Sequence, residues 1–251
     1  MIFVIAFKEL RSLFFSPLAW SILAVLQFLT AYLFLGQLEL FIQVKPRLIL
    51  LNDSPGLTEI VVTPIFSNAA LILLMVMPLL TMRLISEEKR LHTLSLLISS
   101  PISITEIVLG KYFAIVGFIL IMLFMIALMP LALLLGGNLD YGMLAAGFLA
   151  LFLLLSSFAA AGLYLSTLCT QPIIAAVSTF GLLLFLWIID WSVSLLNPQQ
   201  SSALSHLSML KHYQPLLEGV FKSSDVIFYL LFIITFLILS IRKLDAERLQ
   251  H

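Results

Sequence analysis

Long apolar stretches recur along the chain and limit what it can fold into. Six runs with few charged side chains lie at about 18–36, 65–82, 112–136, 143–169, 173–196 and 226–241. A helix needs roughly 20 mainly apolar residues to cross the hydrocarbon core of a bilayer. The runs are continuous, whereas the strands of a membrane barrel alternate apolar and polar residues. The sequence therefore predicts an all-α, polytopic membrane protein with six transmembrane helices.

Composition excludes most other classes of protein. The chain has 251 residues, of which 62% are hydrophobic and 10% are charged, and its formal net charge is zero. Soluble domains are about 45–50% apolar and about 25% charged, so a soluble enzyme is excluded. A neutral chain gives no reason to expect nucleic acid as a partner. Cys169 is the only cysteine, which allows no internal disulfide and suggests no metal site. We expect one transmembrane domain, 1–251, in contact with the lipid bilayer.

The basic residues predict the orientation in the membrane. Six spans place both termini on one side, and nine of the 13 Lys and Arg residues belong to that side: Lys8, Arg11, Arg83, Lys89, Arg90, Lys111, Arg242, Lys243 and Arg248. Loops rich in Lys and Arg stay in the cytoplasm. Both termini and the loop between the second and third spans are therefore expected to be cytoplasmic. The loops at 37–64 and 197–225 face outward, with short helices expected at 37–51 and around 216–221.

The segment 1–16 is predicted to form an amphipathic helix at the membrane interface. Phe3, Phe7, Leu10 and Phe14 recur on one face, and Lys8 and Arg11 lie on the other. Such a helix lies flat in the interface before the chain turns into the first span at 17.

The loop 84–100 carries a second helix signal. Ser86 is placed to cap a helix whose first turn holds Glu87 and Glu88, which suits the helix dipole. Leu91, Leu94 and Leu97 then recur at a spacing of three, so the pattern predicts a helix from 87 to 98 with an apolar stripe. That stripe suits docking in a groove of another protein, although a connector resting on the bilayer fits the pattern too. Ser103 and Glu106 form a capping box for the helix that leads into the third span.

Residues typical of enzymes are missing. The chain contains neither a phosphate loop nor a zinc-binding or serine-nucleophile motif. Asp190 is the one acidic residue well inside an apolar run, between Trp187 and Trp191. An interfacial anchor near the outer boundary and a role in a translocation path are both consistent with this position.

Several segments resemble a known family. The loop at 87–97 and 100–111 is similar to the coupling-helix region of ABC-2 type permeases, the membrane subunits of ATP-binding-cassette transporters. The segment 7–12 is similar to that family's interfacial elbow, and 212–225 with 242–248 resembles its gliding-motility-type subgroup. Where the family usually has Gly before the Thr, this chain has His92. A residue that favours helix more than Gly is expected to make the loop helix more continuous.

The resemblance implies a function that the residues alone do not give. It implies a permease that couples ATP hydrolysis by a separate cytoplasmic ATPase to movement of a substrate, in the direction of export. ATP and magnesium would bind to that ATPase, and this chain would be no enzyme. The loop residues expected to contact the ATPase are Glu87, Glu88, Arg90, Leu91, His92, Thr93, Leu94 and Leu97, and Asp190 is the candidate for the path.

The resemblance also implies partners and a location. A second permease subunit, identical or different, would complete the transporter in the bacterial inner membrane. The alternative is a membrane anchor or scaffold that transports nothing and passes ATPase motion to other proteins.

Overall fold

The computed structural model describes residues 1–48, 56–94, 102–133, 139–195 and 208–248, and the side chains of 47, 48 and 190–195 lie outside that description. Within these ranges every regular element is a helix: α1 (Ile2–Phe15), α2 (Pro17–Leu48), η1 (Thr58–Val62), α3 (Thr63–Thr81), α4 (Ser86–Arg90), α6 (Ile104–Ala132), α7 (Tyr141–Leu168), α8 (Pro172–Leu195), α10 (Met209–Leu217) and α11 (Ser223–Arg248).

Six helical segments are long and apolar enough to cross a membrane. They are Pro17–Pro46, Thr58–Arg90, Ile104–Ala132, Tyr141–Leu168, Pro172–Ile189 and Ser223–Arg248. The prediction of an all-α protein with six transmembrane helices is thereby confirmed. Pro17 and Pro172 begin α2 and α8, where the missing N–H would have had no partner in the helix.

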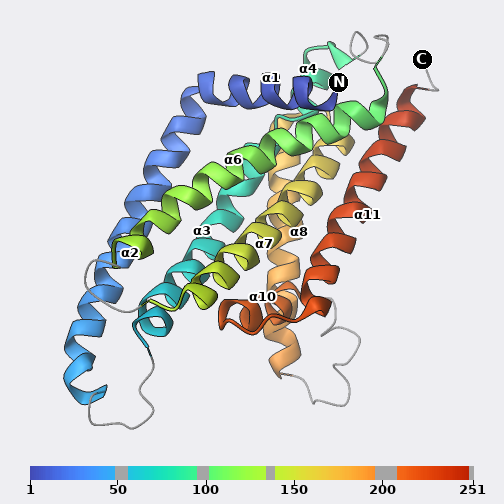
Figure 1. Ribbon diagram of the computed structural model, residues 1–251. Coiled ribbons are helices and arrows are strands. Elements are labelled where there is room, and N and C mark those ends of the chain that lie inside the picture. The colour runs from blue at the N-terminus through green and yellow to red at the C-terminus, as the bar shows by residue number, and fades with distance from the viewer. Residues whose placement is uncertain (49–55, 95–101, 134–138, 196–207, 249–251) are drawn as a thin grey trace.

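The helices form a bundle around α7, which packs against α3, α6, α8, α10 and α11. Figure 1 shows α1 crossing one end of the bundle and α2 descending from it along the outside. Both chain termini and α4 lie at the same end as α1, and α10 lies at the opposite end. We call these the α4 end and the α10 end.

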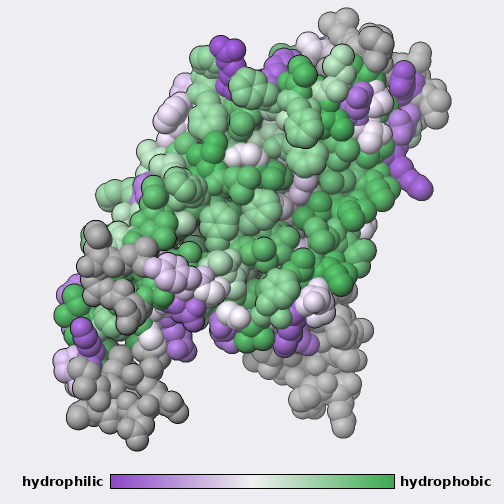
Figure 2. Space-filling view, viewed as in Figure 1, coloured by the Kyte–Doolittle hydropathy of each residue, from purple (hydrophilic) through white to green (hydrophobic). Residues whose placement is uncertain are grey.

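The surface matches a membrane-embedded bundle. Figure 2 shows a broad apolar band between the two ends, with hydrophilic side chains gathered at the rims. Large apolar side chains are exposed along the outer helices, among them Phe28 of α2, Phe124 of α6 and Phe185 of α8. Apolar surface of this extent is stable when it faces lipid or another membrane subunit.

Small residues allow α7 to lie close to its neighbours. Ser157, Ala160 and Gly162 of α7 are buried within the subunit. A Cβ added to Gly162 would lie 2.2 Å from Oγ1 of Thr81 in α3. Close backbone approach of this kind is typical of small residues at helix contacts in membranes.

The termini of α6 and α7 follow the expected chemistry. Ser103 caps α6, and its side chain and that of Glu106 form both hydrogen bonds of the predicted capping box. Asp140 caps α7 by accepting hydrogen bonds from the N–H groups of Gly142 and Met143.

Two expectations for the loops at the α10 end were wrong. Residues 37–48 continue α2 and form no separate helix. No Pro or other strong helix breaker lies between 37 and 45, and Pro46 falls in the last turn of α2. The second loop forms α10 further upstream than predicted, from Met209, because Ser208 caps it. Leu216 and Leu217 are buried in the bundle and do not lie on the membrane surface.

The close contact at Gly162 yields a testable prediction. We expect Gly162→Ala to lower the free energy of unfolding by about 1–3 kcal/mol, because overpacking forces α3 and α7 apart. Gly181→Ala in α8 is the matched control, since its Cβ would meet nothing within 4 Å and alanine favours helix. Thermal unfolding of the purified protein in detergent measures both. Equal midpoints for the two variants would contradict the packing described here.

Candidate functional site

The helix in the loop between the second and third spans is shorter than predicted. α4 comprises five residues, Ser86–Arg90, and the chain then turns through 91 and 92. The predicted continuous helix from 87 to 98 is therefore wrong over its described part, 87–94. Leu97 lies outside the described residues.

A left-handed residue ends α4. His92 has a φ of 56°, the conformation that favours glycine. The N–H of Thr93 donates to the carbonyl of Glu88 at 3.0 Å, and the N–H of His92 donates to the carbonyl of Lys89 at 3.2 Å. These two bonds are those of a Schellman motif with His92 at the left-handed position. The expectation that His92 would make the helix more continuous is wrong, because α4 ends at this left-handed position. A Gly at 92 would adopt the same positive φ.

The N-terminus of α4 is capped by another helix. The hydroxyl of Ser166, in α7, accepts hydrogen bonds from the N–H groups of Ile85 and Ser86 at 3.0 Å each. Ser86 was predicted to be the cap, but it is the first helical residue, and its own hydroxyl donates to the carbonyl of Met82. Ser166 also donates to that carbonyl, at 3.2 Å. One side chain of α7 thus joins α4 to the end of α3.

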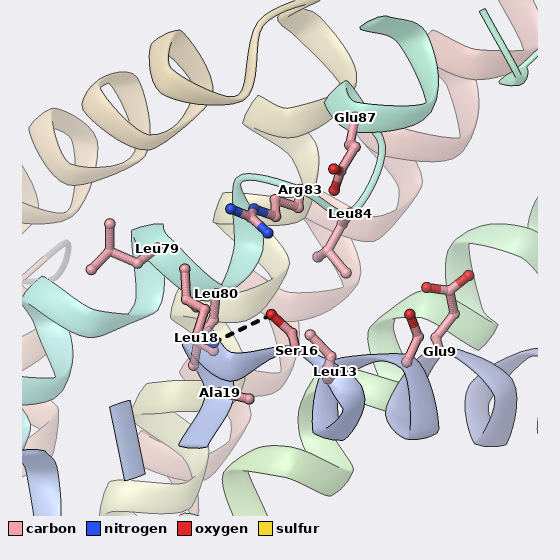
Figure 3. A pocket seen from close by; sticks show the side chains of 11 residues that line it. Glu9, Leu13, Ser16, Leu18, Ala19, Leu79, Leu80, Arg83, Leu84 and Glu87 are labelled. Carbon is pink, nitrogen blue, oxygen red and sulfur yellow. Dashed lines mark hydrogen bonds between the residues drawn. The ribbon is translucent and has the colours of Figure 1, made fainter. Parts of the chain in front are cut away.

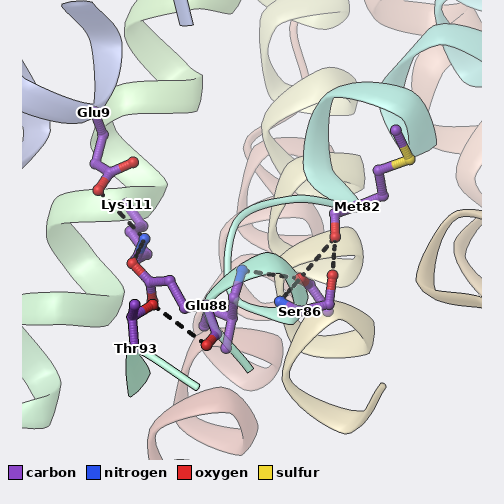
Figure 4. Close-up of polar contacts among 8 residues, drawn as sticks. Glu9, Met82, Ser86, Glu88, Thr93 and Lys111 are labelled. Atoms are coloured by element: carbon purple, nitrogen blue, oxygen red, sulfur yellow. Dashed lines mark hydrogen bonds and ion pairs between the residues drawn. The ribbon is translucent and has the colours of Figure 1, made fainter. Parts of the chain in front are cut away.

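A buried lysine bonds α4 to α1 and α6. The side chain of Lys111, in the second turn of α6, is 3% exposed. Its Nζ lies 2.8 Å from Oε1 of Glu88 in α4 and 3.3 Å from Oε1 of Glu9 in α1. Figure 4 shows the carboxylates of Glu9 and Glu88 converging on Lys111. A second contact supports the same junction, because a Cβ added to Gly110 would lie 2.7 Å from Ile5 of α1.

A second lysine, Lys89 of α4, bonds this helix to α7 and α11. Lys89 Nζ lies 2.7 Å from Oε1 of Glu247 in α11 and donates to the carbonyl of Thr167 near the end of α7. Its side chain is 10% exposed. Lys243 adds a longer contact to Glu247, at 3.5 Å. The two lysine clusters and Ser166 therefore join α4 to α1, α6, α7 and α11.

The outer face of α4 remains accessible. Arg90, Leu91, His92 and Thr93 are exposed, and Leu91 is 59% exposed. Glu87 is partly exposed and lies 3.9 Å from Arg90. Leu94, in contrast, packs against the hydrophobic core. The predicted leucine stripe is thus divided, since Leu91 faces outward and Leu94 inward.

The sequence did not predict the buried ion pairs. Glu88 was expected on a docking surface, and the structure turns it toward Lys111. The available signal was Lys111 itself, a charge within the first turns of an apolar span, because such charges are stable only when paired. Its partners come from segments 102 and 23 positions away, so spacing alone gives no pairing.

The α10 end is also closed by polar contacts. Nδ1 of His212 lies 2.7 Å from Oδ1 of Asp225, which joins α10 to the start of α11. The hydroxyl of Tyr213 donates to the carbonyl of Phe66 at 2.9 Å, and burial raises the pKa of this phenol well above its usual value. The phenol is therefore neutral and serves as a donor. Asp190 belongs to α8, but its side chain lies outside the described residues, and its role stays a prediction.

The chain is thus a multi-pass membrane protein with a short helix presented at the end where its termini lie. A family of known proteins matches it over nearly its whole length: the sequence profile described as ABC-2 family transporter protein covers residues 3–247. No curated protein matches the chain. The chain therefore belongs to the ABC-2 transporter family and is a membrane permease component of an ABC transporter. The profile does not single out the gliding-motility-type subgroup, which stays a prediction.

Lys111 gives the sharpest prediction for this site. We expect Lys111→Met to lower the free energy of unfolding by about 3 kcal/mol or more, because it leaves two carboxylates half-buried without a cation. Lys243→Met is the control. Its side chain is 41% exposed, so its loss costs at most about 1 kcal/mol. Adding Glu9→Gln and Glu88→Gln to Lys111→Met removes the uncompensated charge and recovers stability. A Lys111→Met variant as stable as Lys243→Met would contradict this account.

The left-handed turn gives a second prediction. We expect His92→Gly to be more stable than His92→Ala by about 1 kcal/mol, because only Ala pays for positive φ. Both variants remove the imidazole, so the difference isolates the backbone. Arg90→Gly and Arg90→Ala, within α4, should show the opposite order, since Ala favours helix. Denaturation of the four variants in detergent measures this, and the same order at both positions would refute the left-handed turn.

Proposed function

We propose that this permease couples ATP hydrolysis in a separate cytoplasmic ATP-binding-cassette ATPase to the movement of a substrate, in the direction of export, and that α4 is the coupling helix. ATP and magnesium bind to the ATPase in this proposal. The permease supplies the membrane path and the surface on which the ATPase acts.

One observation carries the proposal: α4 is exposed on one side and, on the other, is bonded to α6, α7 and α11 and, through Lys111, to α1. The exposed side consists of Arg90 of α4 and of Leu91, His92 and Thr93 in the turn that follows it. The bonded side consists of Glu88 and Lys89, with Ser166 at the N-terminus. A force on the exposed side therefore acts on α1, α6, α7 and α11 together.

The bonds of α4 suit the transmission of motion. Each buried ion pair costs several kcal/mol to break when one partner is lost, so α4 moves with the bundle more readily than it separates from it. Allosteric coupling needs such an element between the two sites. We infer that closure of the ATPases displaces α4, and that α1, α6 and α11 follow it.

The chemistry of the exposed side suggests how the ATPase binds. Leu91 supplies an exposed apolar contact, and Arg90 and Glu87 supply charges of both signs beside it. An apolar anchor with a polar rim is the usual anatomy of a protein interface. We therefore place the ATPase contact on the exposed side of α4, with Leu91 at its centre.

We propose that the α4 end faces the cytoplasm of a bacterial cell and that the chain lies in the inner membrane. Lys8, Arg11, Lys243 and Arg248 gather at that end with the α4 basic residues, in line with the positive-inside rule. Both termini are then cytoplasmic, and α10 faces outward.

The interior of one subunit suggests that the path requires a second subunit. Among the described residues, the buried polar groups between Lys111 at one end and Asp225 at the other are hydroxyls such as Ser157 and Thr179. These two donate to carbonyls of their own helices. A filled, apolar interior offers no route for a polar substrate. We therefore propose a homo- or heterodimer that forms the path between subunits.

The same filled interior supports the alternative, a membrane scaffold that passes ATPase motion to other proteins, as the resemblance to the gliding-motility-type subgroup suggests. ATP-dependent movement of a labelled amphipathic substrate in reconstituted vesicles would distinguish a transporter from a scaffold.

The test of the coupling helix is Leu91→Asp. A charge in an apolar contact loses its hydration without gaining a partner, so we expect ATPase recovery with the permease to fall by about tenfold or more. Leu91 is the residue to change because Leu94 packs in the core, where a charge would disturb folding. The measurement is co-purification of the ATPase with permease variants at matched expression.

Val220→Asp is the matched control. Val220 is 48% exposed at the α10 end, far from the proposed contact, so the ATPase should be recovered as with the wild type. Equal recovery with Leu91→Asp and Val220→Asp would show that α4 is not the ATPase contact.

A further inference from the structure

A cavity of about 120 Å³ opens at the α4 end, between α1, the start of α2, the end of α3 and α4. We call it the elbow pocket. One wall is polar and consists of Glu9, Ser12, Ser16, Arg83 and Glu87. The apolar part of the lining includes Leu18, Leu79 and Leu80. Figure 3 shows Arg83 extending over Leu79 and Leu80, Glu87 near Leu84, and Ser16 beside Leu18 at the junction of α1 and α2.

Arg83 is the basic residue of the pocket lining, and its side chain is exposed and open to a ligand from outside. In the part of the chain that the structure describes, the Arg83 guanidinium makes no ion pair. The two carboxylates of the polar wall, those of Glu9 and Glu87, are paired with Lys111 and Arg90 instead. Guanidinium presents five N–H donors in a plane that matches the oxygens of a phosphate. The hydroxyls of Ser12 and Ser16 lie in the same wall and add donors.

The carboxylates of the wall limit which phosphate fits. Glu9 shares the ammonium of Lys111 with Glu88 and lies 3.3 Å from it, whereas the ion pair of Glu87 within the described residues is the long contact of 3.9 Å to Arg90. A ligand with an anionic phosphate alone would leave Glu87 beside a like charge. A ligand that also carries an ammonium with N–H donors would satisfy Arg83 and Glu87 together.

The apolar wall and the level of the pocket indicate a lipid. Leu79 is 44% exposed and continues into the apolar surface of the bundle, where acyl chains would lie. Trp20, one turn into α2, donates its indole N–H to the carbonyl of Phe14 at the junction of α1 and α2. Tryptophan is typical of the headgroup level of a bilayer. A soluble phosphate compound would gain nothing from the leucines.

We propose that the elbow pocket binds the headgroup of an aminophospholipid, with its phosphate on Arg83 and its ammonium on Glu87. The ethanolamine headgroup meets both requirements. A glycerol headgroup lacks the cation, and a choline headgroup lacks N–H donors for Glu87 and is bulkier. This site shares Glu87 with the proposed ATPase contact, but its other residues lie on the α1 and α3 side of α4, and lipid binding needs no partner protein.

The test is lipid retention by the full chain, measured by native mass spectrometry after transfer from nanodiscs of equimolar phosphatidylethanolamine, phosphatidylglycerol and phosphatidylcholine. The wild type should retain the ethanolamine lipid preferentially. Arg83→Ala should lower that retention by about tenfold, the loss expected for a charge-assisted contact. Arg242→Ala, an exposed arginine of α11 outside the pocket, is the matched control and should retain lipid as the wild type does.

Glu87→Gln separates the two halves of the headgroup. It keeps the phosphate contact with Arg83, so the variant should still retain lipid but lose its preference for ethanolamine over glycerol. Equal retention of the three lipids by the wild type, or equal retention by Arg83→Ala and Arg242→Ala, would overturn the proposal. Displacement of the lipid by millimolar soluble phosphoethanolamine would also overturn it, because the leucine wall would then contribute nothing.

Discussion

Two buried lysines set the arrangement of the α4 end. Lys111 of α6 and Lys89 of α4 each place an ammonium where water has little access, and each is paired with carboxylates from other helices. A buried charge without a partner is so costly that Glu9, Glu88 and Glu247 must stay near these ammonium groups. The positions of α1, α4 and α11 relative to α6 and α7 follow from that requirement. Gly110 of α6 likewise allows α1 to approach closely, and Gly162 of α7 does the same for α3.

This arrangement links the fold to the proposed coupling. Helices that cross a bilayer gain little from packing apolar faces against one another, since lipid is equally apolar. Polar bonds at the interface therefore decide which helices move together. α4 is too short to be stable alone, and a helix of five residues persists because Ser166, Glu88 and Lys89 bond it to the bundle. The same bonds suit α4 to transmit motion from the proposed ATPase to the bundle. The elbow pocket lies beside α4, so the proposed lipid headgroup would lie against this helix.

The sequence predicted what local patterns determine. Apolar runs predicted six spans, and the Ser103 capping box and the helix at 2–15 follow from spacing along the chain. The sequence-based predictions were wrong where contacts with residues distant in the chain determine the local structure. His92 favours helix more than Gly by propensity, yet it takes the left-handed position. There the N–H groups of His92 and Thr93 bond to the carbonyls of Lys89 and Glu88, and α4 ends. Ser86 has the right type for a cap, but Ser166, 80 positions away, fills that role. The leucine stripe predicted one docking face, whereas of its two described leucines Leu94 packs on the core and Leu91 is exposed.

Hydrogen exchange of the permease alone tests most directly whether α4 belongs to the bundle before any partner binds. A peptide covering 82–93 reports on the N–H groups of Ile85, Ser86 and Thr93, all of which are hydrogen-bonded. These amides should exchange far more slowly than unstructured chain in the wild type, and faster in Ser166→Ala, which removes the cap from α7. Exchange at the unstructured rate in the wild type would contradict the account, because the loop would then be a free connector that takes its shape only on the ATPase.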